Sequence, residues 1–163
     1  MLTAGEKVPD ATVIKMGDDG PEQASIVDML AGRKVVVFGL PGAFTSTCSN
    51  AHVPSFIQTA KELLNNGVDE IICLSVNDAH VMRAWGDATA GTAAGITFLA
   101  DADGSFTTAI DMKFDAPVAG LFGRSKRYSM LVEDGVVTFF NVEPKAGEFG
   151  LTGGEAMLAQ VKG

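Results

Sequence analysis

Residues 35–49 read VVVFGLPGAFTSTCS, and this stretch decides how the rest of the chain is interpreted. Its first part, Val35 to Phe38, is a short apolar run of branched residues, which is typical of a strand buried on both faces of a sheet. Its second part contains Pro41 and Cys48 and leads into a helical pattern. The stretch therefore predicts a central strand, a loop at its carboxyl end, and a helix that begins near Cys48.

The helical pattern after Cys48 is an apolar stripe that ends near Asn65-Asn66-Gly67. Its members recur at three- and four-residue intervals: Val53, Phe56, Ile57, Ala60, Leu63 and Leu64. A second branched run at 71–76 then predicts another buried strand. The order strand, helix, strand predicts a parallel pair with a right-handed crossover.

The alternation of strands and helices continues towards the C-terminus. Asn77-Asp78 can cap a helix that carries Val81, Met82, Ala84 and Trp85, and residues 96–100 read as a third strand. Runs at 128–132 and 136–140 flank an Asp-Gly pair suited to a tight hairpin, and a last helix is expected over 155–161. We therefore predict an α/β, thioredoxin-like fold: a central mixed β-sheet with helices on both faces, in one domain over residues 1–163 without internal repeats.

Composition and charge narrow the classes of function. The chain has 163 residues, 47% of them hydrophobic, and a formal net charge of -8, which disfavours nucleic acid and anionic membranes as partners. Residues 1–7 lack the basic and apolar regions of a secretory or transit peptide. The longest apolar stretch, 35–44, is too short to cross a bilayer. We therefore expect a cytoplasmic protein that acts on a small molecule.

The two cysteines, Cys48 and Cys73, have opposite surroundings. Neither belongs to a CxxC or zinc-ligand pattern, so neither a structural metal site nor a CxxC disulfide oxidoreductase is expected. Cys48 falls in the first turn of a helix, where unpaired amides and the helix dipole favour a thiolate. Cys73 lies inside an apolar strand. Cys48 is therefore the candidate nucleophile, and a buried cysteine at a helix start is the alternative.

The residues around Cys48 also resemble a known family. Pro41, Thr45 and Cys48 form the pattern PxxxTxxC, which resembles the active-site motif of the peroxiredoxins. The string PGAFTSTCS is similar to PGAFTPTCS of the type II, or peroxiredoxin-five-like, group, with Ser46 where many relatives have proline. Three further segments agree with that group in the same order: CLSVND at 73–78, RYSM at 127–130 and NVEP at 141–144. The resemblance extends over nearly the whole chain.

This resemblance implies a thiol peroxidase that reduces hydrogen peroxide and alkyl hydroperoxides without metal, haem or flavin. Cys48 would attack a peroxide oxygen and become a sulfenic acid, and Thr45 would hydrogen-bond the peroxide. Arg127 would lie beside the thiolate, and Pro41 would shield it from water. Backbone amides near Thr47 and Cys48 would complete the donors around the breaking O–O bond. Because relatives commonly pair through the loops around this site, a homodimer is expected.

A sulfenic acid must be returned to thiol by a second cysteine or by an external thiol. Some relatives carry a resolving cysteine in a GLTCS segment, but residues 150–154 here read GLTGG. Cys73 has a spacing from Cys48 shared with plant-type and many bacterial type II members, yet its apolar strand argues against access. We therefore expect glutathione with glutaredoxin as the reductant, with thioredoxin, or direct resolution by Cys73, as alternatives.

Other functions stay open on the sequence alone. A peroxide sensor or redox-regulated chaperone would begin with the same thiolate but end in altered binding instead of turnover. His52 lies four residues after Cys48, on the same face of an α-helix, so a Cys-His dyad for acyl transfer is also considered. No residue that would orient the imidazole is identified. Arg124 and Lys126, in the same basic run as Arg127, read as solvated charges.

Overall fold

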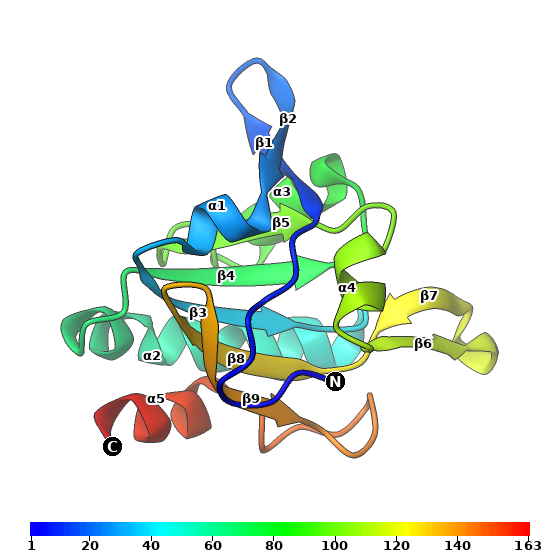
Figure 1. The fold of residues 1–163 in the computed structure, drawn as a ribbon. Coiled ribbons are helices and arrows are strands. Elements are labelled where there is room, and N and C mark those ends of the chain that lie inside the picture. The colour runs from blue at the N-terminus through cyan, green and yellow to red at the C-terminus, as the bar shows by residue number, and fades with distance from the viewer.

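The computed structural model describes residues 1–163, and a seven-stranded mixed sheet forms its centre (Figure 1). Three parallel strands occupy the middle of the sheet: β3 (Lys34–Gly39), β4 (Glu70–Ser75) and β5 (Ile96–Ala100). These are the strands that the apolar runs predicted, and most of their residues are buried. Antiparallel strands extend the sheet on both sides in the order β2-β1-β5-β4-β3-β8-β9.

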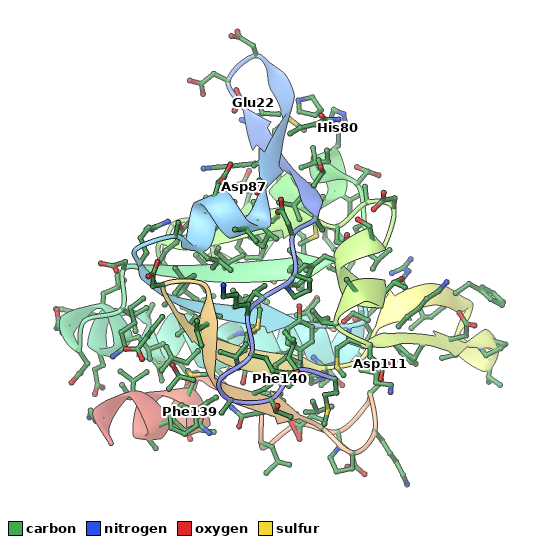
Figure 2. All side chains as sticks on the ribbon, viewed as in Figure 1. Glu22, His80, Asp87, Asp111, Phe139 and Phe140 are labelled. Carbon is green, nitrogen blue, oxygen red and sulfur yellow. The ribbon has the colours of Figure 1, made fainter.

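The hairpin predicted near the C-terminus is present as β8 (Tyr128–Glu133) and β9 (Val136–Val142). Asp134 and Gly135 connect the two strands with φ angles of 48° and 76°, the positive values that a tight hairpin turn requires. Neighbouring side chains of β9 point to opposite faces of the sheet, as the labelled Phe139 and Phe140 show in Figure 2.

Helices cover both faces of the sheet, as predicted. One face carries α2 (Val53–Asn65), α3 (Ala79–Ala88) and α5 (Gly154–Lys162), and the other carries the short helices α1 (Ile26–Leu30) and α4 (Ser105–Ala109). Phe38 and Cys73 point into the core on the α2 side, whereas Val37 and Leu74 point into the core on the α1 side. Because each central strand faces two cores, its sequence is continuously apolar rather than alternating.

Several elements were not predicted, and their sequences explain why. In the hairpin of β1 (Thr12–Gly17) and β2 (Gly20–Ser25), β2 reads GPEQAS and has no large apolar residue that would reveal an alternation. The helices α1 and α4 have five residues each, too few to show a helical period. A separate antiparallel arm, β6 (Lys113–Ala116) and β7 (Leu121–Ser125), projects from the side of the sheet (Figure 1).

Candidate active site

Cys48 lies at the start of the helix that follows β3, as the sequence predicted. Helical conformation begins at Ser46, but residues Cys48–His52 form a π-helical turn before α2 begins. In this turn the N–H of Val53 donates to the carbonyl oxygen of Cys48, five residues earlier, instead of the four-residue spacing of an α-helix. The turn therefore changes where the side chains of Cys48 and His52 point relative to each other.

The Cys48 sulfur contacts the guanidinium group that the family resemblance assigned to it. Nη2 of Arg127, at the start of β8, donates a hydrogen bond to Sγ of Cys48 over 3.4 Å. Cys48 is 0% exposed and Arg127 is 1% exposed, so water screens their interaction little. An arginine remains charged even when buried, so the Cys48 sulfur lies beside a fixed positive charge.

Arg127 is held by two further hydrogen bonds. Its Nη1 lies 2.9 Å from Nδ1 of His52, and its Nε donates to the carbonyl oxygen of Ala146 over 3.2 Å. Because a guanidinium can only donate, Nδ1 of His52 must be the acceptor. The ring proton therefore sits on Nε2, which lies 3.0 Å from the carbonyl oxygen of Thr152 and donates to it.

This arrangement does not support the Cys-His dyad considered for acyl transfer. Both ring nitrogens of His52 are engaged, by Arg127 and by Thr152, and no hydrogen bond joins the ring to Cys48. Burial, followed by the positive charge of Arg127, lowers the pKa of His52 to about 3. The imidazole is therefore neutral at physiological pH, and its hydrogen bond is to Arg127 rather than to Cys48.

The loop between β3 and the helix brings Pro41 and Thr45 to the site. Pro41 is buried, and the Thr45 hydroxyl donates to the carbonyl oxygen of Gly42 over 2.8 Å, which leaves its lone pairs free to accept. The backbone amides of Thr47 and Cys48 donate no hydrogen bond within the protein. The loop thus presents one hydroxyl and two free amide donors next to the buried sulfur.

Arg124 has a structural role that the sequence did not indicate. Instead of being a solvated charge, it is partly buried and its Nη1 donates to the carbonyl oxygen of Pro41 over 3.2 Å. The guanidinium passes so close to Gly42 that a Cβ at that position would collide with it. A side chain at position 42 would therefore displace the Arg124 guanidinium from its contact with the loop. Lys126, by contrast, is exposed as expected.

The segments that carry the family resemblance all support this loop and the Arg127 site. In the segment at 73–78, the Asn77 side chain accepts from the backbone amide of Ala43 over 3.0 Å and from the Ser75 hydroxyl over 2.8 Å. In the same segment, Asp78 caps α3. The segment at 127–130 supplies Arg127. These stretches thus meet at one place in the fold although the chain separates them widely.

Glu143, in the segment at 141–144, has a structural role that the sequence did not predict. Its carboxylate accepts hydrogen bonds from the amides of Gly150, Leu151 and Thr152 and from the Thr152 hydroxyl, at 2.7 to 3.1 Å. Burial alone would raise the pKa of Glu143, but the bonds from Thr152 and its neighbours outweigh it and lower the pKa. Glu143 therefore fixes the carbonyl of Thr152 that holds His52.

Cys73 lies in the middle of β4, fully buried in the same core cluster as Cys48. The two cysteines are free thiols and form no disulfide. Burial, reinforced by the nearby Cys48, raises the pKa of the Cys73 thiol well above its ordinary value. The Cys73 side chain is therefore a protonated part of the core, as its apolar strand predicted.

A cavity of about 320 Å³ adjoins the site. Its polar wall includes Thr45, Thr47 and Arg127, and its apolar wall includes Pro41 and residues of the β6–β7 arm: Phe114, Ala116, Ala119 and Leu121.

No cluster of three or more His, Cys, Asp or Glu side chains is arranged to hold a metal ion. None of the helices combines the length and the apolar character needed to cross a membrane.

Comparison with known proteins agrees with this geometry. Residues 3–156 match the family described as Redoxin. Peroxiredoxin-2B of Arabidopsis thaliana is 44% identical over 158 residues, which are 96% of each chain. The crystal structure of reduced Prx3 in complex with H2O2 from Vibrio vulnificus is 44% identical with a TM-score of 0.91, over 99% of each chain. Peroxiredoxin 5 from Alvinella pompejana is 30% identical with a TM-score of 0.85, over 99% of each chain.

The similarity to these proteins covers the sheet, the helices on both faces and the β3–α2 loop, so the predicted thioredoxin-like fold is confirmed. The identity of over 40% to several plant relatives of the type 2 group agrees with the motif at 41–49. The chain therefore belongs to the peroxiredoxin family of thiol peroxidases and, within it, to the type II group.

Proposed function

We propose that this peroxiredoxin reduces hydrogen peroxide and alkyl hydroperoxides with Cys48, and that glutathione with glutaredoxin regenerates the thiol. The observation that carries the proposal is the 3.4 Å contact between Nη2 of Arg127 and Sγ of Cys48, inside a buried site beside an open cavity. In the first step, the thiolate forms a bond to one peroxide oxygen as the O–O bond breaks. The leaving oxygen takes a proton and departs as water or an alcohol, and Cys48 becomes a sulfenic acid.

The groups around the sulfur suit this transition state, in which negative charge spreads from sulfur onto two oxygens. Arg127 supplies a fixed positive charge, and the free amides of Thr47 and Cys48 supply donors that need no rearrangement. The Thr45 hydroxyl can accept a hydrogen bond from the peroxide while it donates to Gly42. By analogy with oxyanion holes, each donor contributes roughly 10²- to 10³-fold to the rate.

The composition of the adjoining cavity supports both substrate classes. Its polar wall at Thr45, Thr47 and Arg127 fits the peroxide group, and its apolar wall at Pro41 and Leu121 fits an alkyl chain. The similar Prx3 from Vibrio vulnificus has been crystallised in complex with H2O2, which supports hydrogen peroxide as a substrate here. Because the Cys48 sulfur is fully buried, small uncharged peroxides would reach it more easily than larger molecules.

Two features of the cysteines support an external reductant. Cys73 is buried in β4 with a raised pKa, so it is a poor nucleophile towards a sulfenic acid at Cys48. Residues 150–154 contain no cysteine, and Thr152 is tied to Glu143 and His52. Glutathione would attack the sulfenic acid and release water, forming a mixed disulfide. Glutaredoxin would then remove the glutathionyl group and leave the Cys48 thiol.

The test is a peroxidase assay that supplies one reductant system at a time to the wild type and to two cysteine variants. We expect continuous consumption of H2O2 with glutathione and glutaredoxin, abolished in Cys48→Ser and largely retained in Cys73→Ser. Turnover with the thioredoxin system but not with glutathione and glutaredoxin would identify thioredoxin as the reductant. Loss of turnover in Cys73→Ser would show that Cys73 resolves the sulfenic acid. Consumption of a single equivalent of peroxide with every reductant would instead favour the sensor function.

We further propose that two copies of the chain pair around the active-site cavity. Three apolar side chains next to it are exposed: Phe44 at 59%, Val118 at 106% and Phe122 at 66%. Phe44 precedes Thr45 in the catalytic loop, and the other two belong to the β6–β7 arm, whose residues line the cavity. Large exposed apolar side chains on the segments around one cavity are a feature of protein interfaces.

We also propose that the protein works in a reducing compartment, with the cytoplasm as the expected one. Both cysteines are free, which suits a compartment in which thiols remain reduced. Several relatives are named as chloroplastic or mitochondrial proteins. Fractionation of the source cells, followed by detection of the protein in each fraction, tests the cytoplasmic assignment.

A further inference from the structure

His52 is a buried titratable residue near Cys48 to which the peroxidase reaction assigns no part. We propose that His52 is a positioning residue, which holds the guanidinium of Arg127 in the orientation that contacts the Cys48 sulfur. The proposal rests on the proposed function, in which Arg127 assists the attack of Cys48 on peroxide. His52 itself does not contact the sulfur, so it acts only through Arg127.

The three hydrogen bonds of Arg127 show why it needs a permanent partner. Its contact with Cys48 changes in every cycle, because the sulfur becomes a sulfenic acid and then a thiol again. The bonds from Nη1 to His52 and from Nε to Ala146 do not depend on the state of the sulfur. Two fixed bonds at different nitrogens define the plane of a guanidinium. Of these two, the bond to His52 is the shorter and is fully buried.

The surroundings of His52 fix the ring itself. Nε2 donates to the carbonyl of Thr152, which Glu143 holds through the amide and hydroxyl of Thr152. Three aromatic rings surround the imidazole at centroid distances of 4.9 to 5.7 Å: those of Phe38, Phe56 and Phe149. In this environment the ring keeps one tautomer with an unprotonated Nδ1, which is the form that accepts from a guanidinium. The buried, neutral state of the ring agrees with the lowered pKa of His52.

Two amide substitutions separate this role from simple packing. In His52→Asn the side-chain oxygen lies near the former Nδ1 and still accepts from Arg127. In His52→Gln the amide lies near the former Nε2, so it reaches Thr152 and leaves Nη1 of Arg127 without its acceptor. Both variants lose the aromatic ring, so each is the matched control of the other for loss of packing.

The rate of Cys48 oxidation by H2O2 is measured by stopped flow at neutral pH in the wild type and in both variants. For His52→Gln, loss of a hydrogen bond to a charged group is expected to lower the second-order rate constant roughly 10- to 100-fold. For His52→Asn, which keeps the acceptor for Arg127, the rate constant is expected to stay close to that of the wild type. Cys73, the other titratable neighbour of Cys48, stays protonated and unchanged in both variants.

Equal rates in the two variants, whether high or low, would overturn the proposal, as would a slower Asn variant. If only the wild type folds, ¹⁵N NMR of its imidazole decides: the proposal requires protonated Nε2 and unprotonated Nδ1 at neutral pH, and the opposite tautomer rejects it. A wild type that reacts with peroxide while the variants do not differ rejects the role of His52 alone. A wild type that fails to react with peroxide rejects the proposed function as well.

Discussion

Arg127 and Cys48 are separated by 79 residues in the chain, and they meet in the core where Nη2 donates to Sγ over 3.4 Å. Both side chains are buried, so substitution of either one leaves the other with one hydrogen-bond partner fewer and without water to replace it. Two further donors of Arg127 bind the ring of His52 and the carbonyl of Ala146. The positive charge beside the sulfur is therefore that of a guanidinium held from two other parts of the chain.

Replacement of Arg127 by lysine is expected to slow the reaction with peroxide although it keeps the charge. An ammonium group on a flexible stem cannot reach the sulfur, the imidazole and the carbonyl at once in the geometry of a guanidinium. We expect Arg127→Lys to lower the rate constant for Cys48 oxidation by about 10²-fold. Stopped-flow measurement with H2O2 gives this number.

The matched control for this prediction is Lys126→Gln. Lys126 precedes Arg127 in the chain but is exposed and makes no side-chain hydrogen bond or ion pair. Its substitution is expected to leave the rate constant unchanged. If Arg127→Lys reacts as fast as Lys126→Gln, the guanidinium geometry has no part in the reaction.

The central fold was predictable from the sequence because its strands face two cores. The runs at 35–38, 71–76 and 96–100 are apolar at nearly every position, and a helical stripe lies between the first two. The β2 strand and the short helices α1 and α4 lack such patterns, so their positions depend on tertiary contacts. A local pattern cannot report an element that only its neighbours stabilise.

The candidate site was predictable only in part, for similar reasons. The position of Cys48 at a helix start follows from local sequence, but the approach of Arg127 came from the family resemblance, since no pattern links such distant residues. The spacing of His52 from Cys48 suggested a dyad because an α-helix was assumed. A π-helical turn has no signature in the sequence. In the structure His52 ends such a turn and binds Arg127 instead of Cys48. Glu143 and Ala146 lie in a loop without periodicity.

The lowered pKa of His52 predicts a loss of stability in mild acid. The folded protein keeps the imidazole neutral down to a pKa of about 3, whereas the unfolded chain binds a proton below about 6.5. The unfolded state therefore binds more protons between these values, so stability falls as the pH falls through this range. One such group lowers the free energy of unfolding by about 1.4 kcal/mol per pH unit.

Urea unfolding at pH 7, 6 and 5 measures this effect. The wild type is expected to lose stability steadily over these points, and His52→Asn is expected to lose less because its side chain does not titrate. Glu143 also has a lowered pKa, but its contribution disappears at lower pH, through the range of a carboxyl group. Parallel pH dependences in the wild type and in His52→Asn would show that folding does not lower the pKa of His52.

The single tryptophan is expected to report the opening of the active-site helix. Nε1 of Trp85, in α3, donates to the hydroxyl of Ser49, the residue after Cys48, over 3.0 Å. A buried Cys48 can form a mixed disulfide with glutathione only if the turn Cys48–His52 moves, which breaks this bond. We therefore expect a change in Trp85 emission when the glutathionylated protein forms, measured by fluorescence in parallel with mass spectrometry. In Ser49→Ala the bond is already absent, so the change should be much smaller, and an equal change in both proteins would contradict this explanation.

Substitution of Phe122 by aspartate is expected to separate the proposed dimer. Phe122 is 66% exposed on β7, in the arm that borders the active-site cavity, and a carboxylate there would have to be buried without a partner when two copies pair. Sedimentation velocity at micromolar concentration should show a dimer for the wild type and a monomer for Phe122→Asp. The matched control is Leu64→Asp, because Leu64 is 43% exposed near the far end of α2, away from the cavity. A dimer that survives Phe122→Asp but not Leu64→Asp would place the interface on α2. A monomeric wild type would contradict the proposed dimer.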